Sequence, residues 1–391
     1  MNWKLTLAIC VGILLLASLA VGGIFISEPT AQRSSATKRS AMLVELSKVE
    51  QGTFRPTIVA TGTVRPEQEI SLSPRVSGQV ISLAENFTPG GYVAEGEILL
   101  QIDPADYETL VLQRRSELHQ AEAELAMEAG RQEQARRDYE ELKGTISDKY
   151  RTLVLREPQL NAAEAIVESA EAALRQAELD LERTRVRAPF PAHVLSREAH
   201  VGSQVTPNQV LGQLVGVEAY WVEASVPVSS LRWIEFPENG AGQARGADAQ
   251  VRNRAAWPEN TFRTGKVDKL VGALESETRL ARVLIRVNDP LAQSPESAGQ
   301  QPLMVGSFVQ VRIEGKPIEN VIRMNRAYLR QNDTVWVMQD GLLRIVPVEV
   351  VFGDDNYVYI GEGLDPSAQV VSTNLATVVE GASLRLAGEI P

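Results

Sequence analysis

Apolar and polar residues between positions 104 and 184 alternate with the three-four spacing of long helices. The second half of this segment is regular. Its apolar and small residues are Leu160, Ala163, Val167, Ala170, Leu174, Ala177 and Leu181. In the first half, the stripe that begins at Tyr107 is interrupted by Arg114, Glu128 and Gln132. Two such stripes predict two helices that pack as an antiparallel coiled-coil hairpin.

The turn of this hairpin is predicted at Lys143-Gly144-Thr145-Ile146, because this site halves the segment and Ser147 or Asp148 can cap the next helix. Each arm would then be about 55 Å long at 1.5 Å per residue. We expect Pro158 to kink the second helix, since proline removes one hydrogen bond and clashes with the preceding turn. In the alternative, Pro158 lies in the first turn of that helix and residues 144–157 form an irregular tip.

Two copies of one short pattern flank the helical segment. Gly90–Ile102 reads GGYVAEGEILLQI and Gly202–Leu214 reads GSQVTPNQVLGQL, and the two align without a gap. Each has a glycine turn, a short apolar strand, a second turn and a second strand. Asn208 can replace Gly96 because asparagine accepts a positive φ. The copies are therefore predicted to form two halves of one β-sandwich that the hairpin splits.

Strand patterns dominate the rest of the chain. YWVEASVPV near Trp221, RVLIRV near Ile285 and SFVQVRI near Val309 alternate in a way that predicts a β-barrel domain. After Pro317, the short strands TVWVM, LRIVPVEVVF, YVYIG and QVVST predict a further β domain. Each β domain is expected to draw strands from both sides of the hairpin.

The N-terminus carries an apolar stretch from Leu5 to Ile26, which at 22 residues is long enough to cross a bilayer as a helix. A secretory signal peptide is the alternative, with a small-residue cleavage site at Ser18-Leu19-Ala20. We favour an uncleaved anchor, because the apolar run continues through Val21 to Ile26. Both interpretations predict that the rest of the chain is exported. Residues 27–41 are predicted to be a flexible tether.

These features together resemble a known family. Paired lipoyl-like half-motifs around a coiled-coil hairpin, with Arg-Ala-Pro-Phe from Arg187 opening the second half, resemble the periplasmic adaptor subunits of bacterial efflux pumps. These subunits are also called membrane fusion proteins, or the HlyD-like family. The chain departs from the family at Pro191-Ala192-His193, where Asp-Gly is usual. This departure puts the geometry of one turn in doubt, but not the fold.

The resemblance implies an α+β, elongated, multidomain fold, in which the hairpin is inserted in a split lipoyl-like sandwich that a β-barrel and a membrane-proximal β domain follow. The implied domains are the anchor or signal segment (1–26), a linker (27–41), the membrane-proximal domain (42–49 and 317–391), the barrel (50–66 and 217–316), the lipoyl-like domain (67–103 and 185–216) and the α-hairpin (104–184).

The resemblance also implies the partners. They are an inner-membrane efflux transporter beside the β domains, an outer-membrane TolC-like channel at the hairpin tip, the inner membrane through the N-terminal anchor, and further copies of the chain in a homo-oligomeric ring. The implied location is the periplasmic side of the inner membrane. At the tip, Arg137, Leu142 and Ser147 are the residue types that such adaptors present, although their spacing is compressed, and Gly144 marks the turn. Alternatively, Arg137 is a solvated helix residue and Ser147 a helix cap.

Composition narrows the function further. The formal net charge of −11 argues against nucleic-acid binding, which needs a basic surface. The single cysteine, Cys10, lies in the apolar stretch, and the three histidines have no metal-ligand spacing. A lipoyl or biotinyl carrier needs a lysine, yet none occurs from Val49 through Leu142 or from Tyr150 through Gly265. We therefore expect no enzyme activity, catalytic residue, cofactor or metal.

The class of transporter is predicted from the hairpin length and the late β segments, which fit the resistance-nodulation-division (RND) class. An adaptor of an ABC-type exporter is one alternative, and a structural periplasmic coiled-coil scaffold without a transporter is another.

Overall fold

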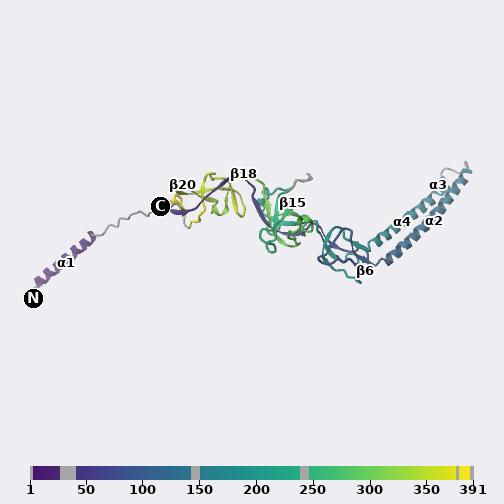
Figure 1. Cartoon of the computed structure of the whole chain (residues 1–391), viewed down its shortest axis with the longest axis horizontal. Helices are drawn as coiled ribbons and strands as arrows, with labels where there is room; N and C mark the ends of the chain where they lie inside the picture. Colours follow the sequence, from purple (N-terminus) through teal and green to yellow (C-terminus); the bar gives the residue numbers. More distant parts are fainter. Residues whose placement is uncertain (1–2, 27–40, 142–149, 238–245, 376–377, 388–391) are drawn as a thin grey trace. The chain divides into compact units, whose positions relative to one another are not determined.

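The computed structural model describes residues 3–26, 41–141, 150–237, 246–375 and 378–387. The chain forms two compact units. One combines Met1–Phe54 with Glu319–Pro391, and the other is Arg55–Ile318. Figure 1 shows the course of the chain through both. The predicted fold class is confirmed. The unit Arg55–Ile318 contains a split sandwich with a helical hairpin inserted in it, and also a closed barrel. The other unit is a further β domain.

The sandwich consists of two four-stranded sheets, with strand orders β5-β12-β10-β7 and β11-β6-β8-β9. Its strands are β5 (Glu69–Leu72), β6 (Gly78–Leu83), β7 (Tyr92–Val93), β8 (Ile98–Ile102), β9 (Arg185–Arg187), β10 (Ala192–Arg197), β11 (Gln204–Val205) and β12 (Gly212–Gly216). Every sheet takes two strands from before the hairpin and two from after it. Neither half of the sequence can therefore form a sheet of this sandwich alone.

The two halves are structurally equivalent, as the sequence repeat predicts. Gly90 and Gly202 have the same φ of +88°, and Gly96 at +76° corresponds to Asn208 at +71°. The paired strand residues of both copies lie in one core. Val93, Leu99, Ile102, Val205, Leu211 and Leu214 are all 0% exposed. The prediction that the copies pack as halves of one sandwich is confirmed.

The departure at Pro191-Ala192-His193 leaves the sandwich intact. Strand β10 begins at Ala192, which is buried and pairs with Val93 of β7 on one side and Gly216 of β12 on the other. The small side chain of Ala192 suits a position enclosed between two neighbouring strands.

Three helices occupy the segment between β8 and β9. They are α2 (Ala105–Glu141), α3 (Arg151–Val154) and α4 (Glu157–Glu182). On α4, the regular stripe from Leu160 to Leu181 is half-buried or buried throughout. On α2, the interrupting residue Glu128 is buried, and Arg114 and Gln132 are half-buried, so the stripe continues through all three. The seam positions of α2 therefore keep regular spacing, but three of them are occupied by polar or charged residues.

The expected kink at Pro158 is wrong. Helix α4 begins at Glu157, and Pro158 lies in its first turn, where its missing N–H removes no helical hydrogen bond. The alternative placed Pro158 correctly, but the segment before it is not wholly irregular, because Arg151–Val154 is helical. The predicted turn at Lys143 to Ile146 lies outside the described residues.

The barrel closes in the order β13-β16-β15-β14-β17-β4. Its strands are β4 (Thr57–Pro66), β13 (Ala219–Val226), β14 (Asp248–Arg252), β15 (Arg263–Leu274), β16 (Ala281–Asn288) and β17 (Phe308–Glu314), with short 3-10 helices η2 (Val228–Trp233) and η3 (Pro295–Ser297) beside them. Every second residue of β16 is buried, as the alternating pattern predicts. Buried Arg263 donates hydrogen bonds to the carbonyl oxygens of Asn288, Asp289, Pro290 and Gln301, which fastens the connection between β16 and β17 to the barrel.

The remaining unit is built from both sides of the chain. Its strands are β1 (Met42–Val44), β2 (Leu46–Lys48), β3 (Glu50–Phe54), β18 (Ile318–Asn325), β19 (Leu329–Arg330), β20 (Thr334–Gln339), β21 (Leu342–Pro347), β22 (Glu349–Gly353), β23 (Tyr357–Glu362), β24 (Gln369–Val371) and β25 (Leu384–Leu386), with the 3-10 helix η4 (Arg326–Tyr328). The N-terminal strands β1, β2 and β3 pair with β25, β24 and β18 respectively.

One boundary differs from the expected domains. We expected residues 50–66 in the barrel, but β3 (Glu50–Phe54) pairs with β18 and belongs to the unit that includes the chain ends. Side-chain packing accounts for the shift. The Arg323 guanidinium lies 4.4 Å from the centre of the Phe54 ring, and that ring lies 6.3 Å from the ring of Tyr359.

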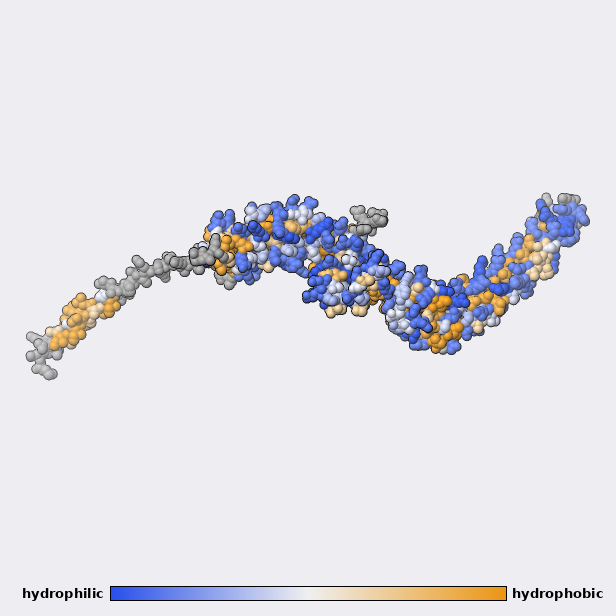
Figure 2. Space-filling view, viewed as in Figure 1, coloured by the Kyte–Doolittle hydropathy of each residue, from blue (hydrophilic) through white to orange (hydrophobic). Residues whose placement is uncertain are grey.

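The N-terminal helix α1 (Trp3–Ile26) contains the only span among the described residues that is long and apolar enough to cross a membrane. That span, Leu7–Ile24, has a mean hydropathy of 2.6 and none of it is buried in the protein. Figure 2 shows that the surface of α1 is apolar. By contrast, the distal end of the hairpin, which is the end farthest from the sandwich, is largely hydrophilic. Length and composition of this kind suit a membrane anchor and an export signal equally.

The equivalence of Gly96 and Asn208 can be tested by exchange. Asn208→Val should lower the free energy of unfolding by about 1–2 kcal/mol, because a β-branched residue is strained at positive φ. Gly96→Asn should change it by less than about 0.5 kcal/mol, since a Cβ at Gly96 would meet nothing within 4 Å. Urea unfolding followed by circular dichroism measures both. Equal losses in the two variants would contradict the equivalence.

Candidate partner-binding site at the distal end of the hairpin

The predicted site residues lie where α2 ends. Arg137 is on the last turns of α2, with its side chain 67% exposed and its Nε 3.4 Å from the Glu133 carboxylate one turn earlier. Leu142, Gly144 and Ser147 lie outside the described residues. The structure therefore places one of the four predicted residues, and shows that it is available at the surface.

Two further exposed side chains stand near this end. Tyr150 is 55% exposed and Leu153, on α3, is 58% exposed. The sequence analysis did not single them out, because they lie in the segment between the two regular stripes. Exposed apolar side chains of this kind can contact another protein.

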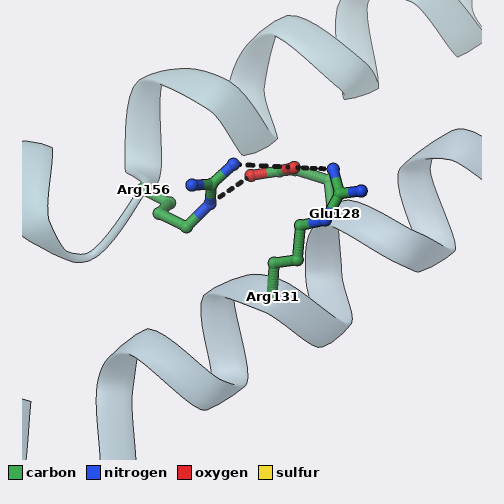
Figure 3. Close-up of polar contacts among 3 residues, drawn as sticks. All are labelled: Glu128, Arg131 and Arg156. Carbon is green, nitrogen blue, oxygen red and sulfur yellow. Dashed lines mark hydrogen bonds and ion pairs between the residues drawn. The ribbon is translucent and has the colours of Figure 1, made fainter. Parts of the chain in front are cut away.

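The distal hairpin is held together by an ion pair inside the helix seam. Glu128 of α2 is buried, and both of its carboxylate oxygens accept hydrogen bonds from Arg156, Oε1 from Nε at 2.7 Å and Oε2 from Nη2 at 3.1 Å. Arg131, one turn along α2, donates to Oε2 from Nη1 at 3.2 Å. Figure 3 shows the carboxylate between the two guanidinium groups. We call the paired Glu128 and Arg156 the clasp.

Arg156 also joins the helices through its backbone. Its N–H donates to the carbonyl oxygen of Leu153 at the end of α3, and its own carbonyl accepts from Gln159 and Leu160 at the start of α4. Its φ is +57°, the left-handed conformation that non-glycine residues rarely adopt. Such a conformation costs on the order of 1 kcal/mol and persists where the surroundings impose it. Here the side chain bound to Glu128 supplies that constraint.

The two arginines keep Glu128 ionised. The hydrogen bond from Arg156 is the largest influence and lowers the pKa of Glu128 below the ordinary value of 4.5, although burial acts in the opposite direction and Arg131 adds a smaller lowering. The same hydrogen bond raises the pKa of Arg156. Both partners are therefore charged at neutral pH.

The sequence holds a partial signal for the clasp. Glu128 interrupts the apolar stripe of α2 at a position that the spacing assigns to the seam, and a carboxylate there needs a cationic partner. The identity of that partner could not be derived. Arg156 is 28 residues away, and its conformation depends on the break between α3 and α4.

Within the residues that the structure describes, no group of three or more His, Cys, Asp and Glu side chains is arranged to hold a metal ion. The distal end of the hairpin combines exposed side chains with an ion pair between the helices.

Comparison with known proteins identifies the sandwich. Residues 68–216 match the family model of the barrel-sandwich hybrid domain of RND membrane fusion proteins. The sandwich and the hairpin inserted in it resemble those of the RND membrane fusion proteins. The matched residues cover all eight strands of the sandwich together with the hairpin inserted in it.

Several known proteins are similar over most of the chain. Multidrug resistance protein MdtA of Klebsiella pneumoniae subsp. pneumoniae is 25% identical over 345 residues, which are 84% of this chain and 76% of that protein. The crystal structure of MacA from Actinobacillus actinomycetemcomitans has a TM-score of 0.56 at 18% identity, covering 85% of this chain and 100% of MacA. A chimera of MacA with the α-hairpin domain of Pseudomonas aeruginosa MexA has a TM-score of 0.53 at 22% identity, covering 82% of this chain and 98% of the chimera. The solved structures show a shared fold.

Acid should loosen the distal hairpin. Because the folded-state pKa of Glu128 is depressed, its contribution to stability is full above the ordinary glutamate pKa and is lost as pH falls through the lower folded value. Hydrogen exchange of the Leu155 and Arg156 amides should therefore have the same protection factor at pH 7 and pH 5.5, and a smaller one near pH 3. In Glu128→Gln this step should disappear. An unchanged step in that variant would assign it to another carboxylate.

Proposed function

We propose that this chain is the periplasmic adaptor of a tripartite export pump, in which it bridges an inner-membrane efflux transporter of the RND class and an outer-membrane channel. The match of residues 68–216 to the RND barrel-sandwich hybrid domain, with the hairpin inserted at its centre, carries the proposal. It also favours the RND class over an ABC-type exporter. The role is to hold two partners together, with no catalytic step.

The hairpin gives this bridging role a physical basis. Helix α2 has 37 residues and is therefore about 55 Å long. It begins at the sandwich and ends at Glu141, one turn beyond the exposed Arg137. We assign the channel contact to this end, through Arg137, Leu142, Gly144 and Ser147, and the transporter contact to the β domains. An apolar side chain at the free end of a helix pair gains most by burial against another protein.

We further assign α1 as an uncleaved anchor, which places the chain on the periplasmic side of the inner membrane. The reason for this assignment is that the apolar run continues past the possible cleavage site at Ala20 as far as Ile26. A homo-oligomeric ring is the proposed assembly. Ile166 and Leu179 of α4 are 53% and 46% exposed, and the packing of neighbouring hairpins would bury such side chains.

Co-purification with an RND transporter tests the bridging role directly. The sharper test substitutes Leu142. Leu142→Asp should weaken capture of a TolC-like channel by at least about tenfold, because burying a leucine contributes roughly 1.5–3 kcal/mol and about 1.4 kcal/mol corresponds to a factor of ten. Helical content, thermal stability and transporter binding should remain those of the wild type.

Leu195→Asp is the matched control, since Leu195 is 40% exposed on the sandwich and lies outside the hairpin. It should leave channel capture unchanged. Loss of folding in Leu142→Asp would make Leu142 the last layer of the hairpin core. Unchanged capture would place the channel contact elsewhere.

The mature N-terminus tests the anchor. If α1 is uncleaved, mass spectrometry of the mature protein should find the peptide that contains Trp3 and Lys4, because nothing removes the first turn of the helix. A mature N-terminus at Val21 would show instead that the segment is a signal peptide.

A further inference from the structure

We propose that the clasp of Glu128 and Arg156 positions the distal end of the hairpin, holding α3 so that Tyr150 and Leu153 face the outer-membrane channel. This inference rests on the adaptor function proposed above. It assigns a positioning role to two residues of the hairpin interior, and a contact role to two exposed residues outside the predicted tip set.

The connectivity at Arg156 is the first support. One residue is bonded to three helices, since its side chain binds Glu128 of α2, its N–H binds the end of α3, and its carbonyl binds the start of α4. Leu155 adds a hydrogen bond from its N–H to the carbonyl of Arg151 within α3. If the Arg156 side chain is released from Glu128, the orientation of α3 relative to α4 is therefore no longer fixed by α2.

The chemistry of the seam is the second support. Among the described residues of the hairpin, Glu128 is the only buried charged side chain. An apolar residue at its position would suit the seam at least as well energetically, because a buried ion pair gains little over hydrophobic packing. What an ion pair adds is geometry, since a bidentate carboxylate accepts a guanidinium in one orientation. A single charged position in a coiled coil can thus fix how its parts align.

The exposure of Tyr150 and Leu153 is the third support for the proposal. Leu153 projects from α3 and Tyr150 immediately precedes it, and each is more than half exposed. Neither residue belongs to α2 or α4. Exposure of these apolar side chains to water is unfavourable in free energy, and burial against a partner protein would remove this cost.

Two substitutions separate positioning from stability. Glu128→Leu makes the α2 seam apolar at that position and removes the clasp. Arg156→Gly removes the side chain but permits the φ of +57°. Arg131→Ala is the matched control, because Arg131 makes one hydrogen bond to the same carboxylate and its side chain is 63% exposed. Arg156→Lys keeps the charge but can bond only one oxygen well, so it should restore part of the function.

The readouts use the full-length protein with its transporter and an epitope-tagged TolC-like channel. A photo-cross-linking amino acid at Leu153 should form an adduct with the channel in the wild-type background and in Arg131→Ala. In Glu128→Leu and Arg156→Gly, the adduct and efflux should fall about tenfold, while the thermal midpoint and transporter co-purification stay unchanged. The Leu155 and Arg156 amides should exchange about tenfold faster or more, whereas amides from Val111 to Leu125 keep their protection.

Several outcomes would overturn the inference. Full efflux and cross-linking in a folded Glu128→Leu protein would show that the clasp serves stability alone. A wild-type protein that supports efflux and binds its transporter, yet forms no adduct from Leu153, would show that α3 does not meet the channel. A wild-type protein with neither efflux nor transporter binding would overturn the adaptor function itself, and the positioning role with it.

Discussion

The antiparallel pairing of β8 with β9 is the contact on which the second unit depends. These two strands come from opposite sides of the hairpin, and Gln101 lies directly beside Arg185. The N–H of Ile102 also bonds to the carbonyl of Thr184, so the residue range just before α2 is joined to the one just after α4. The pairing therefore closes the sandwich and sets the separation of the two helices at their base. Without it, the hairpin would have no fixed origin and the sheet β11-β6-β8-β9 would lose its edge strand β9.

The distal end is controlled by a different kind of interaction. The distal end lies too far from the sandwich to be fixed by strand pairing. Two helices alone bury few side chains completely, and the buried residues of α2 are Val111, Ala121 and Glu128. Hydrophobic packing in such a thin seam leaves room for sliding. A bidentate ion pair that links α2 to the junction of α3 and α4 resists sliding because its geometry is directional. The positions of the helices are thus fixed by strand pairing at the base of the hairpin and by the ion pair of Glu128 and Arg156 at its distal end.

Much of the fold could be predicted because its signals are local. Asn208 in place of Gly96 indicated a positive φ, and the spacing from Leu160 to Leu181 indicated a seam, and the structure has both. The failures concern features that depend on distant contacts. Pro158 is compatible with either a kink or a helix start, and the choice was settled by Arg156 binding Glu128 across the hairpin. Strand β3 fell outside the barrel because Phe54 packs beside Tyr359, some three hundred residues later. Arg137 alone among the predicted site residues could be placed.

The nesting of strands around the hairpin also orders the folding of the chain. Contacts in the hairpin span a few tens of residues, those that close the sandwich span about a hundred, and the N–H of Glu45 bonds to Thr373 across 328 residues. Loop closure costs more entropy as the separation grows, and distant contacts form late unless nearer ones have already brought them together. Folding from the hairpin outward shortens each later loop in turn. Strands β1 to β3, which a cell synthesises first, are then the last to find partners and remain open to aggregation until the C-terminal strands arrive.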